Sequence, residues 1–184
     1  MKGQLTFNPD VCSGCNTCST ICSVTHFNII NTKRSRIKVL RKEEDNLDVV
    51  NVCVQCNEKY CIQSCPTKPK SLSINPQTGA IDVNYNTCIK CGLCIKACPY
   101  GGISMDLSLK NIIVCDLCGG DPQCVKYCPT NAIQFLPSLL NEYSEKENEK
   151  IKDLTKQILG NMLKNPSNIS FSQYIKIKIK KSNK

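Results

Sequence analysis

Residues 88–99 read Cys-Ile-Lys-Cys-Gly-Leu-Cys-Ile-Lys-Ala-Cys-Pro, with the spacing C-x₂-C-x₂-C-x₃-C-P. The first three thiols crowd into one short loop, and the fourth follows about one helical turn later. Pro99 cannot continue a helix, so the helix is expected to end there. A short apolar segment, Ile103-Ser-Met105, comes next. The stretch therefore predicts a loop, a short helix that carries the last cysteine, and a strand.

This unit recurs, and four such groups use all 16 cysteines of the 184-residue chain. Group one lacks the closing proline, since Ser23 follows Cys22. In groups two and four, more than two residues separate the second cysteine from the third. Group one is Cys12, Cys15, Cys18 and Cys22; group two is Cys53, Cys56, Cys61 and Cys65; group three is Cys88, Cys91, Cys94 and Cys98; group four is Cys115, Cys118, Cys124 and Cys128.

Four closely spaced thiolates suit a [4Fe–4S] cluster, since each iron needs one ligand from the protein. In two-cluster modules, three cysteines of one group hold one cluster and the fourth holds the other. Zinc is the main alternative, but zinc sites usually combine two C-x₂-C pairs across a longer spacer. A radical-SAM site would need C-x₃-C-x₂-C, which none of the groups has. The sequence therefore predicts four [4Fe–4S] clusters.

Residues 51–106 look like one two-cluster module, because a predicted β-hairpin around Asn75-Pro-Gln-Thr-Gly79 joins groups two and three. Groups one and four would then form an outer module. Sequential pairing of one with two and three with four stays open, although the 30 residues between Cys22 and Cys53 fit it poorly. The predicted ligand sets are Cys12, Cys15, Cys18 with Cys128; Cys115, Cys118, Cys124 with Cys22; Cys53, Cys56, Cys61 with Cys98; and Cys88, Cys91, Cys94 with Cys65.

The predicted fold class is α+β: two fused bacterial-ferredoxin-like modules plus a C-terminal helical extension. The inner module is expected over residues 51–106, and the outer module over 1–50 with 107–136. Residues 137–184 would form the extension, with a helix over 139–163 that could dock on a partner and a strand-like alternation over 174–180. Another strand is expected near Arg36–Leu40.

Composition narrows the classes of function. Without Trp and with 5% aromatic residues, the chain has little material for a large apolar core, so cluster ligation is expected to stabilise it. The net charge of +9 counts every cysteine as neutral, and thiolates around cluster cores would bring it close to zero, which disfavours nucleic-acid binding.

The N-terminus lacks a secretory pattern, and no apolar run reaches about 18 residues. We therefore expect a cytoplasmic protein without a membrane span.

These motifs resemble the four-cluster iron–sulfur subunits of molybdenum and tungsten oxidoreductases, the type found in dimethyl-sulfoxide reductase. The resemblance covers about Leu5 to Phe135, and that family pairs its groups as inner and outer. Three segments are most similar to the small partner of tungsten aldehyde:ferredoxin oxidoreductases: Cys12-Ser-Gly-Cys-Asn-Thr-Cys-Ser-Thr-Ile-Cys-Ser-Val-Thr-His26, Ser35-Arg-Ile-Lys38 and Cys115-Asp-Leu-Cys-Gly-Gly-Asp-Pro-Gln-Cys124.

The resemblance implies an electron-transfer subunit without catalytic residues of its own. It would relay single electrons between a catalytic subunit, a tungsten- or molybdenum-pterin enzyme of the aldehyde oxidoreductase type, and ferredoxin or another carrier. The alternatives are a free polyferredoxin, or the electron-transfer subunit of a hydrogenase, carbon monoxide dehydrogenase or formate dehydrogenase.

A few other residues could take part in chemistry, but we expect structural roles for them. His26 is expected to be a packed, hydrogen-bonded histidine, because sixteen cysteines already complete four clusters. Lys90, Lys96 and Lys126 are expected mainly on the solvated surface, and Asp116 in a turn or cap. Tight turns with a positive φ are expected at five glycines: Gly92, Gly101, Gly102, Gly119 and Gly120.

Overall fold

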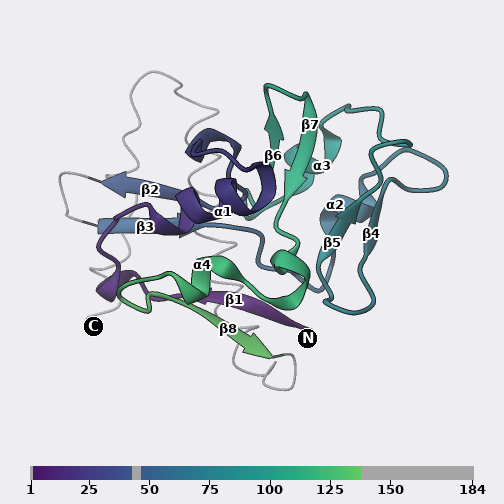
Figure 1. The fold of residues 1–184 in the computed structure, drawn as a ribbon. Helices are drawn as coiled ribbons and strands as arrows, with labels where there is room; N and C mark the ends of the chain where they lie inside the picture. The colour runs from purple at the N-terminus through teal and green to yellow at the C-terminus, as the bar shows by residue number, and fades with distance from the viewer. Residues whose placement is uncertain (1, 43–46, 138–184) are drawn as a thin grey trace.

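The computed structural model describes residues 2–42 and 47–137, where short strands alternate with short helices (Figure 1). The mixed α and β content agrees with the predicted class. The predicted helix over 139–163 and the strand-like segment over 174–180 lie outside the described residues. Among the described residues, no helix has the length and apolar character needed to cross a membrane.

Within the described ranges, the strands form four separate antiparallel pairs instead of one large sheet. The hairpin predicted between groups two and three is confirmed by the pairing of β4 with β5, and the strand expected near residues 36–40 is found slightly later, as β2. The pairs are β1 (Gly3–Phe7) with β8 (Ile133–Pro137), β2 (Lys38–Lys42) with β3 (Leu47–Asn51), β4 (Leu72–Ile74) with β5 (Ile81–Val83), and β6 (Ile103–Asp106) with β7 (Asn111–Val114).

The β1–β8 pair brings the two ends of the described chain together. Leu5 faces Phe135 and Phe7 faces Ile133 in its register. The backbone N–H of Asn8 continues this contact by donating to the carbonyl of Ala132 at 2.8 Å. The loop that leads into group one therefore lies beside the loop that follows group four, along the lower edge of the view in Figure 1.

The helices correct one detail of the predicted unit. Each short helix carries the third cysteine of its group, and the fourth follows beyond the helix end. The residue before a proline is disfavoured in the α conformation, so Cys98 is already extended, with φ −77° and ψ 110°. The three helices are α2 (Tyr60–Gln63) with Cys61, α3 (Leu93–Ala97) with Cys94, and α4 (Gln123–Lys126) with Cys124.

Group one differs because it has no proline. α1 (Thr17–Phe27) runs for 11 residues, passes through Ser23, and carries both Cys18 and Cys22. The Ser23 hydroxyl donates to the carbonyl of Thr20 at 2.8 Å and accepts from the N–H of Asn31 at 3.1 Å. Serine in place of proline thus lets the helix continue and anchors the segment that follows it.

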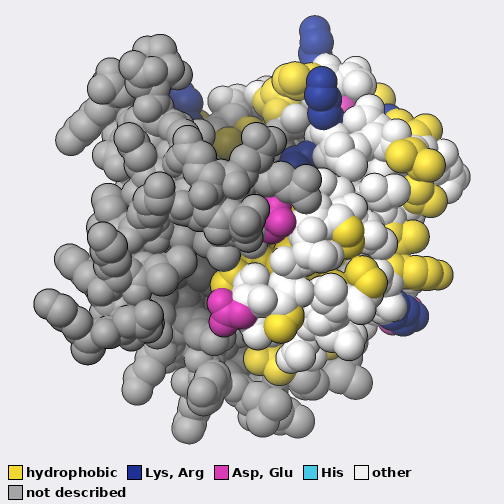
Figure 2. All heavy atoms as spheres, turned by 90° about the vertical axis from the view of Figure 1, so that its left-hand side faces the viewer, with side chains coloured by type: hydrophobic (Ala, Val, Ile, Leu, Met, Phe, Trp, Pro, Cys, Tyr) yellow, Lys and Arg dark blue, Asp and Glu magenta, His cyan; other side chains and the backbone are white. Residues whose placement is uncertain are grey.

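Cysteine makes up much of the core. Aliphatic side chains such as Ile37, Ile81, Ile112 and Leu117 are almost fully buried, and sulfur atoms lie between them. On the face in Figure 2, by contrast, charged side chains of both signs and hydrophobic side chains are interspersed over the described part. The buried cysteines of this core are Cys18, Cys22, Cys53, Cys61, Cys94, Cys98, Cys115 and Cys124.

Candidate iron–sulfur centres

Cysteines from groups two and three line one hollow, which has about 320 Å³ of space open in part to solvent. Ile81, Tyr100 and Ile103 complete its apolar wall. Burial, together with the charges of the neighbouring thiols, raises the pKa of the Cys53 thiol to about 12. We call these cysteines the Cys53 set: Cys53, Cys56, Cys61 and Cys98.

A second hollow of about 270 Å³ also combines groups two and three. Burial raises the pKa of the Cys94 thiol to about 11, while Cys91 is exposed at the surface. Ile112 of β7 closes the inner side. The Cys65 set consists of Cys65, Cys88, Cys91 and Cys94.

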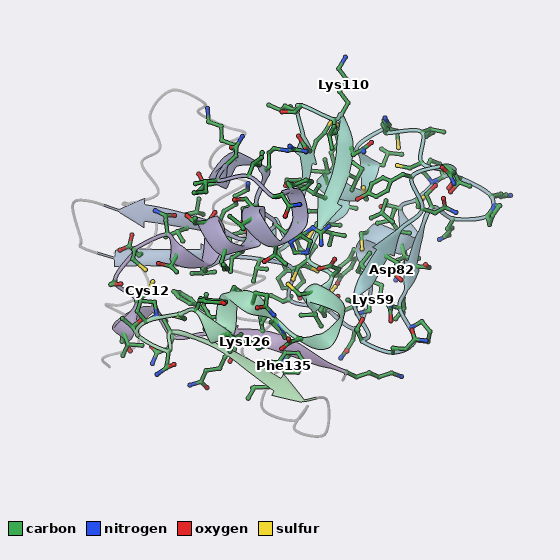
Figure 3. The ribbon with its side chains drawn as sticks, viewed as in Figure 1. Cys12, Lys59, Asp82, Lys110, Lys126 and Phe135 are labelled. Carbon is green, nitrogen blue, oxygen red and sulfur yellow. The ribbon has the colours of Figure 1, made fainter. Side chains whose placement is uncertain are left out.

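Groups one and four meet above the β1–β8 pair. Burial raises the pKa of the Cys18 thiol to about 12, and negative charge on the nearby Cys15, Cys12 and Cys128 adds to the effect. Burial and the charges of Asp48, Cys128 and Cys15 raise the pKa of Cys12 in the same way. Such interactions weaken with separation, so these thiols lie close together. The Cys12 set is Cys12, Cys15, Cys18 and Cys128; Figure 3 labels Cys12.

The remaining cysteines surround the contact between α1 and α4. Burial raises the pKa of the Cys124 thiol to about 12, with further contributions from Cys118, Cys22 and Cys18. Burial also holds the pKa of Cys115 well above its ordinary value. The Cys22 set is Cys22, Cys115, Cys118 and Cys124.

The four sets follow one another in space. Cys18 of the Cys12 set interacts with Cys124 of the Cys22 set, and Cys115 of that set interacts with Cys53 of the next. The Cys53 and Cys65 sets share groups two and three. A hydrogen bond of 2.9 Å from Gln55 Nε2 to the Cys115 carbonyl joins the middle two sets. The order is therefore Cys12, Cys22, Cys53 and Cys65.

Hydroxyl groups accompany three of the cysteines, a feature that the sequence reasoning missed. The pattern Cys-x-Thr occurs at Cys15, Cys65 and Cys128, and also at Cys18, so it could have suggested these three among four candidates. The thiols lie 3.3, 3.3 and 3.8 Å from the hydroxyls of Thr17, Thr67 and Thr130. Burial alone would raise the pKa of the Cys65 thiol, but hydrogen bonds, of which those from Thr67 have the largest effect, lower it to about 7. These hydroxyls favour the thiolate form that ligates metal.

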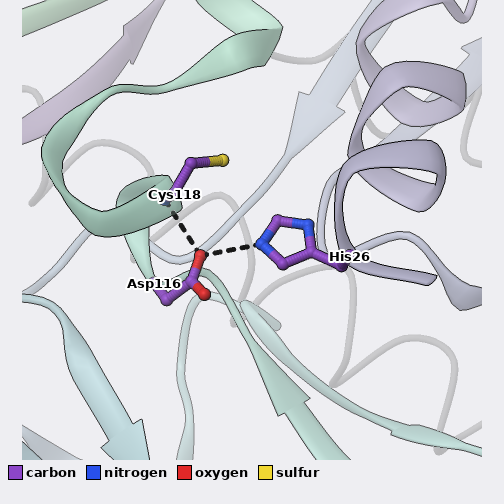
Figure 4. A group of neighbouring side chains, drawn as sticks. All are labelled: His26, Asp116 and Cys118. Atoms are coloured by element: carbon purple, nitrogen blue, oxygen red, sulfur yellow. Dashed lines mark hydrogen bonds and ion pairs between the residues drawn. The ribbon is translucent and has the colours of Figure 1, made fainter. Parts of the chain in front are cut away.

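A polar network lies beside the Cys22 set, and it involves more than the cap expected of Asp116. Asp116 Oδ1 accepts from the N–H of Cys118 at 2.9 Å, which is the cap, and also lies 3.0 Å from His26 Nε2 (Figure 4). Asp116 Oδ2 pairs with Arg36 Nη1. Burial alone would raise the pKa of Asp116, but the hydrogen bonds from His26 and Arg36 hold it well below its usual range.

His26 is packed and hydrogen-bonded, as expected. Its Nδ1 lies 2.8 Å from the carbonyl of Cys22, and its Nε2 faces Asp116. Burial alone would lower the pKa of His26, yet hydrogen bonds with Asp116, Cys118 and Cys22 raise it to about 12. Both ring nitrogens therefore act as donors, and the side chain adds positive charge beside the cysteines.

The lysines and glycines named in the sequence analysis lie in surroundings that indicate mainly structural roles. Lys126 forms an exposed ion pair with Asp121, and Lys90 and Lys96 are exposed. Of the glycines, Gly102 does not have the expected positive φ; it leaves room instead, because a Cβ there would lie 2.5 Å from the Cα of Cys53. A positive φ is present at the other four: Gly92, Gly101, Gly119 and Gly120.

The donor chemistry fits [4Fe–4S] clusters. Each set offers four sulfur atoms, three from one loop and one from a neighbouring group, which is the arrangement that two-cluster ferredoxin modules use. Within the described ranges, His26, Asp116 and Cys118 form a group of three possible ligands of mixed type, with donor atoms within 4.8 Å of one another. Ligation of four clusters by these four sets stays a prediction.

The chain matches the 4Fe–4S dicluster domain family over residues 46–137 and a 4Fe–4S binding domain over residues 9–25. It belongs to the 4Fe–4S dicluster family of iron–sulfur proteins.

Curated relatives are subunits of several oxidoreductases. The chain is 35% identical over 159 residues to the "Aliphatic sulfonate oxidoreductase, polyferredoxin-like subunit" of Pyrococcus furiosus, covering 83% of this chain and 90% of that one. It is 31% identical to one of the chains of polysulfide reductase from Wolinella succinogenes, covering 73% and 75%. It is 32% identical to the β subunit of the NADH-dependent phenylglyoxylate dehydrogenase of Aromatoleum evansii, covering 77% of this chain and 31% of that subunit.

Proposed function

We propose that this chain is the electron-transfer subunit of an oxidoreductase complex and relays single electrons through four [4Fe–4S] clusters. The observation that carries the proposal is the gathering of sixteen cysteines into four sets that follow one another through the molecule. When bound, such clusters accept and release one electron each. The four ligand sets are the Cys12, Cys22, Cys53 and Cys65 sets.

The chain's own residues position and shield these centres. Buried aliphatic side chains, such as Ile81 and Ile103 beside the Cys53 set, keep water away from the sulfur atoms. Threonine hydroxyls and backbone N–H groups stabilise thiolates. Because α1 carries Cys18 and Cys22, a single rigid helix fixes the separation of two sets.

The two ends of this series reach the surface. Cys15 of the Cys12 set and Cys91 of the Cys65 set are both exposed, whereas the inner sets are mostly buried. Ile89 and Leu93, which flank Cys91, are 66% and 42% exposed. We propose that electrons enter at one of these ends and leave at the other, each facing a different partner.

The proposed partner is a catalytic subunit with a tungsten- or molybdenum-pterin site. Support comes from the names of the relatives, several of which are subunits of oxidoreductases. The resemblance of three segments to the small partner of tungsten aldehyde:ferredoxin oxidoreductases favours the tungsten-pterin type. A free polyferredoxin that serves several enzymes is the competing function.

Anaerobic co-purification of the native protein, with metal analysis, distinguishes the two. Tungsten or molybdenum in a complex with a large subunit would support the proposal. Nickel in the complex would assign the subunit to a hydrogenase or carbon monoxide dehydrogenase instead. An isolated chain that contains iron alone would overturn the subunit function and leave the free carrier.

A further inference from the structure

Arg36 contains a buried donor without an acceptor. Its side chain is 15% exposed, and the Nε–H makes no hydrogen bond within residues 2–42 and 47–137. A buried polar group that lacks a partner is costly, so native proteins almost always satisfy it. An acceptor that belongs to a bound group would remove this cost.

The position of Arg36 indicates which group that is. Its backbone N–H donates to Cys22 Sγ at 3.4 Å, and its guanidinium pairs with Asp116, which lies between Cys115 and Cys118 in sequence. Three cysteines of the Cys22 set are thus adjacent to Arg36 or to its ionic partner. The sulfur atoms of an iron–sulfur cluster accept hydrogen bonds, and such bonds help to set its potential.

We propose that Arg36 donates from Nε to a sulfur atom of the cluster held by the Cys22 set, and that this hydrogen bond holds the cluster at a more positive reduction potential. This inference rests on the proposed function. Arg36 acts here as a positioning residue, because it bonds a cluster sulfur without carrying the electron.

The local charges support the direction of the effect. Arg36 contributes a permanent positive charge beside the Cys22 set, and Asp116 contributes the negative charge that pairs with it. Positive charge stabilises the reduced, more negative cluster, and the interaction is strong in a buried setting.

Arg34 provides a matched control two residues earlier. It too pairs with a buried aspartate, with Nε 2.7 Å from Asp106 Oδ2, and its guanidinium stacks on Phe27 at 4.1 Å. Neither of these two contacts involves a sulfur atom. If the two arginines had only a structural role, replacing either of them should therefore have the same effect on the cluster potentials.

The experiment is an anaerobic potentiometric titration of the full holoprotein, followed by electron paramagnetic resonance. We expect Arg36→Met to shift one cluster potential to more negative values and to leave the others in place. Asp116→Asn should shift the same potential in the opposite direction, whereas Arg34→Met should lower thermal stability and shift none. Opposite shifts from two members of one network would not arise from general loosening of the fold.

Unchanged potentials in Arg36→Met, or shifts of the same sign in Arg36→Met and Asp116→Asn, would overturn the inference. If Arg36→Met does not assemble its clusters, the Arg36→Lys variant tests the inference. Lysine keeps the positive charge but lacks the fixed fork of guanidinium donors, so a smaller negative shift of the potential is expected. An unshifted potential in Arg36→Lys would then count against it. Failure of the proposed function would be visible separately, as wild-type protein without four clusters.

Discussion

Gln55 and Cys115 lie sixty residues apart in sequence, yet the buried Gln55 side chain donates to the Cys115 carbonyl at 2.9 Å. One residue belongs to the loop of group two and the other opens group four. The bond therefore connects the Cys53 set with the Cys22 set, the two inner members of the series. It lies where an electron would pass between the halves of the molecule.

Replacing Gln55 with Leu should test this connection. The substitution keeps the volume but leaves the Cys115 carbonyl without this donor, and we expect a loss of about 1–2 kcal/mol in the free energy of unfolding. Anaerobic denaturation of the holoprotein measures it. Gln63→Leu on the exposed side of α2 is the control and should change stability by less than about 0.5 kcal/mol. Equal effects of the two substitutions would contradict the assignment.

Gly102 should tolerate even one additional methyl group poorly. A Cβ at this position would meet the Cα of Cys53 at 2.5 Å and its nitrogen at 2.8 Å, so the backbone that carries a proposed ligand must move. We expect Gly102→Ala to destabilise the holoprotein by about 1–3 kcal/mol and to reduce its iron content.

Gly92→Ala is the matched comparison for Gly102. Gly92 has a φ of +74° but no atom within 4 Å of an added Cβ. Only backbone strain of about 1–2 kcal/mol is expected there, with the iron content unchanged. An iron loss in Gly92→Ala as large as in Gly102→Ala would show that close approach to Cys53 is not the cause.

Asp106 joins β6 to the segment after α1. Its carboxylate accepts from Arg34 Nε at 2.7 Å and from the N–H of Ser108 at 2.8 Å. Asp106→Asn removes the charge, and we expect a loss of about 2 kcal/mol at neutral pH. Urea titration of the holoprotein measures it. The exposed Asp121, paired with Lys126, is the control, and Asp121→Asn should cause no measurable change.

The effect of Asp106 should also depend on pH in one direction. Burial alone would raise the pKa of Asp106, but hydrogen bonds from Arg34, Ser108 and Leu109 lower it. A lowered pKa means that the contribution is present above the ordinary carboxyl pKa of about 3.9 and is lost as the pH falls below it. The stability difference between wild type and Asp106→Asn should therefore be constant from neutral pH upward. A difference that grows with rising pH would contradict this.

The fourth cysteine of each group should belong to a different cluster from the first three. Cys98→Ala is therefore expected to remove the cluster of the Cys53 set and leave the signals of the Cys65 set, although Cys98 belongs to group three. Iron should fall by roughly a quarter. Cys128→Ala should remove the cluster of the Cys12 set by the same logic. Loss of the Cys65-set signals in Cys98→Ala would instead support ligation within each group.

Local sequence was enough to predict the short units of this fold, because their chemistry is local. The proline after Cys65, Cys98 and Cys128 limits the preceding helix, and the Asn75–Gly79 turn gives the β4–β5 hairpin. The predicted helix end was wrong by one cysteine, because the residue before a proline already leaves the α conformation.

Long-range contacts escaped prediction for a different reason. β1 pairs with β8, which lies more than a hundred residues later in the sequence, and only the three-dimensional fold brings the two strands together. The network of Arg36, Asp116 and His26 likewise joins segments that look unrelated in the chain. Asp116 was predicted to lie in a turn or cap, and it does cap the segment Leu117–Gly120, but its two oxygens also contact the side chains of His26 and Arg36.

The meeting of β1 with β8 also bears on how the protein is made. Cys12, Cys15 and Cys18 are synthesised early, whereas Cys128, which lies with them, and β8, which holds that corner together, are synthesised late. The two sets built from groups two and three draw all their cysteines from residues 53–98, so they are the first sets whose members have all been synthesised. On the proposed ligation, iron can be loaded from the middle of the chain outward, and the N-terminal thiols must stay reduced until Cys128 emerges.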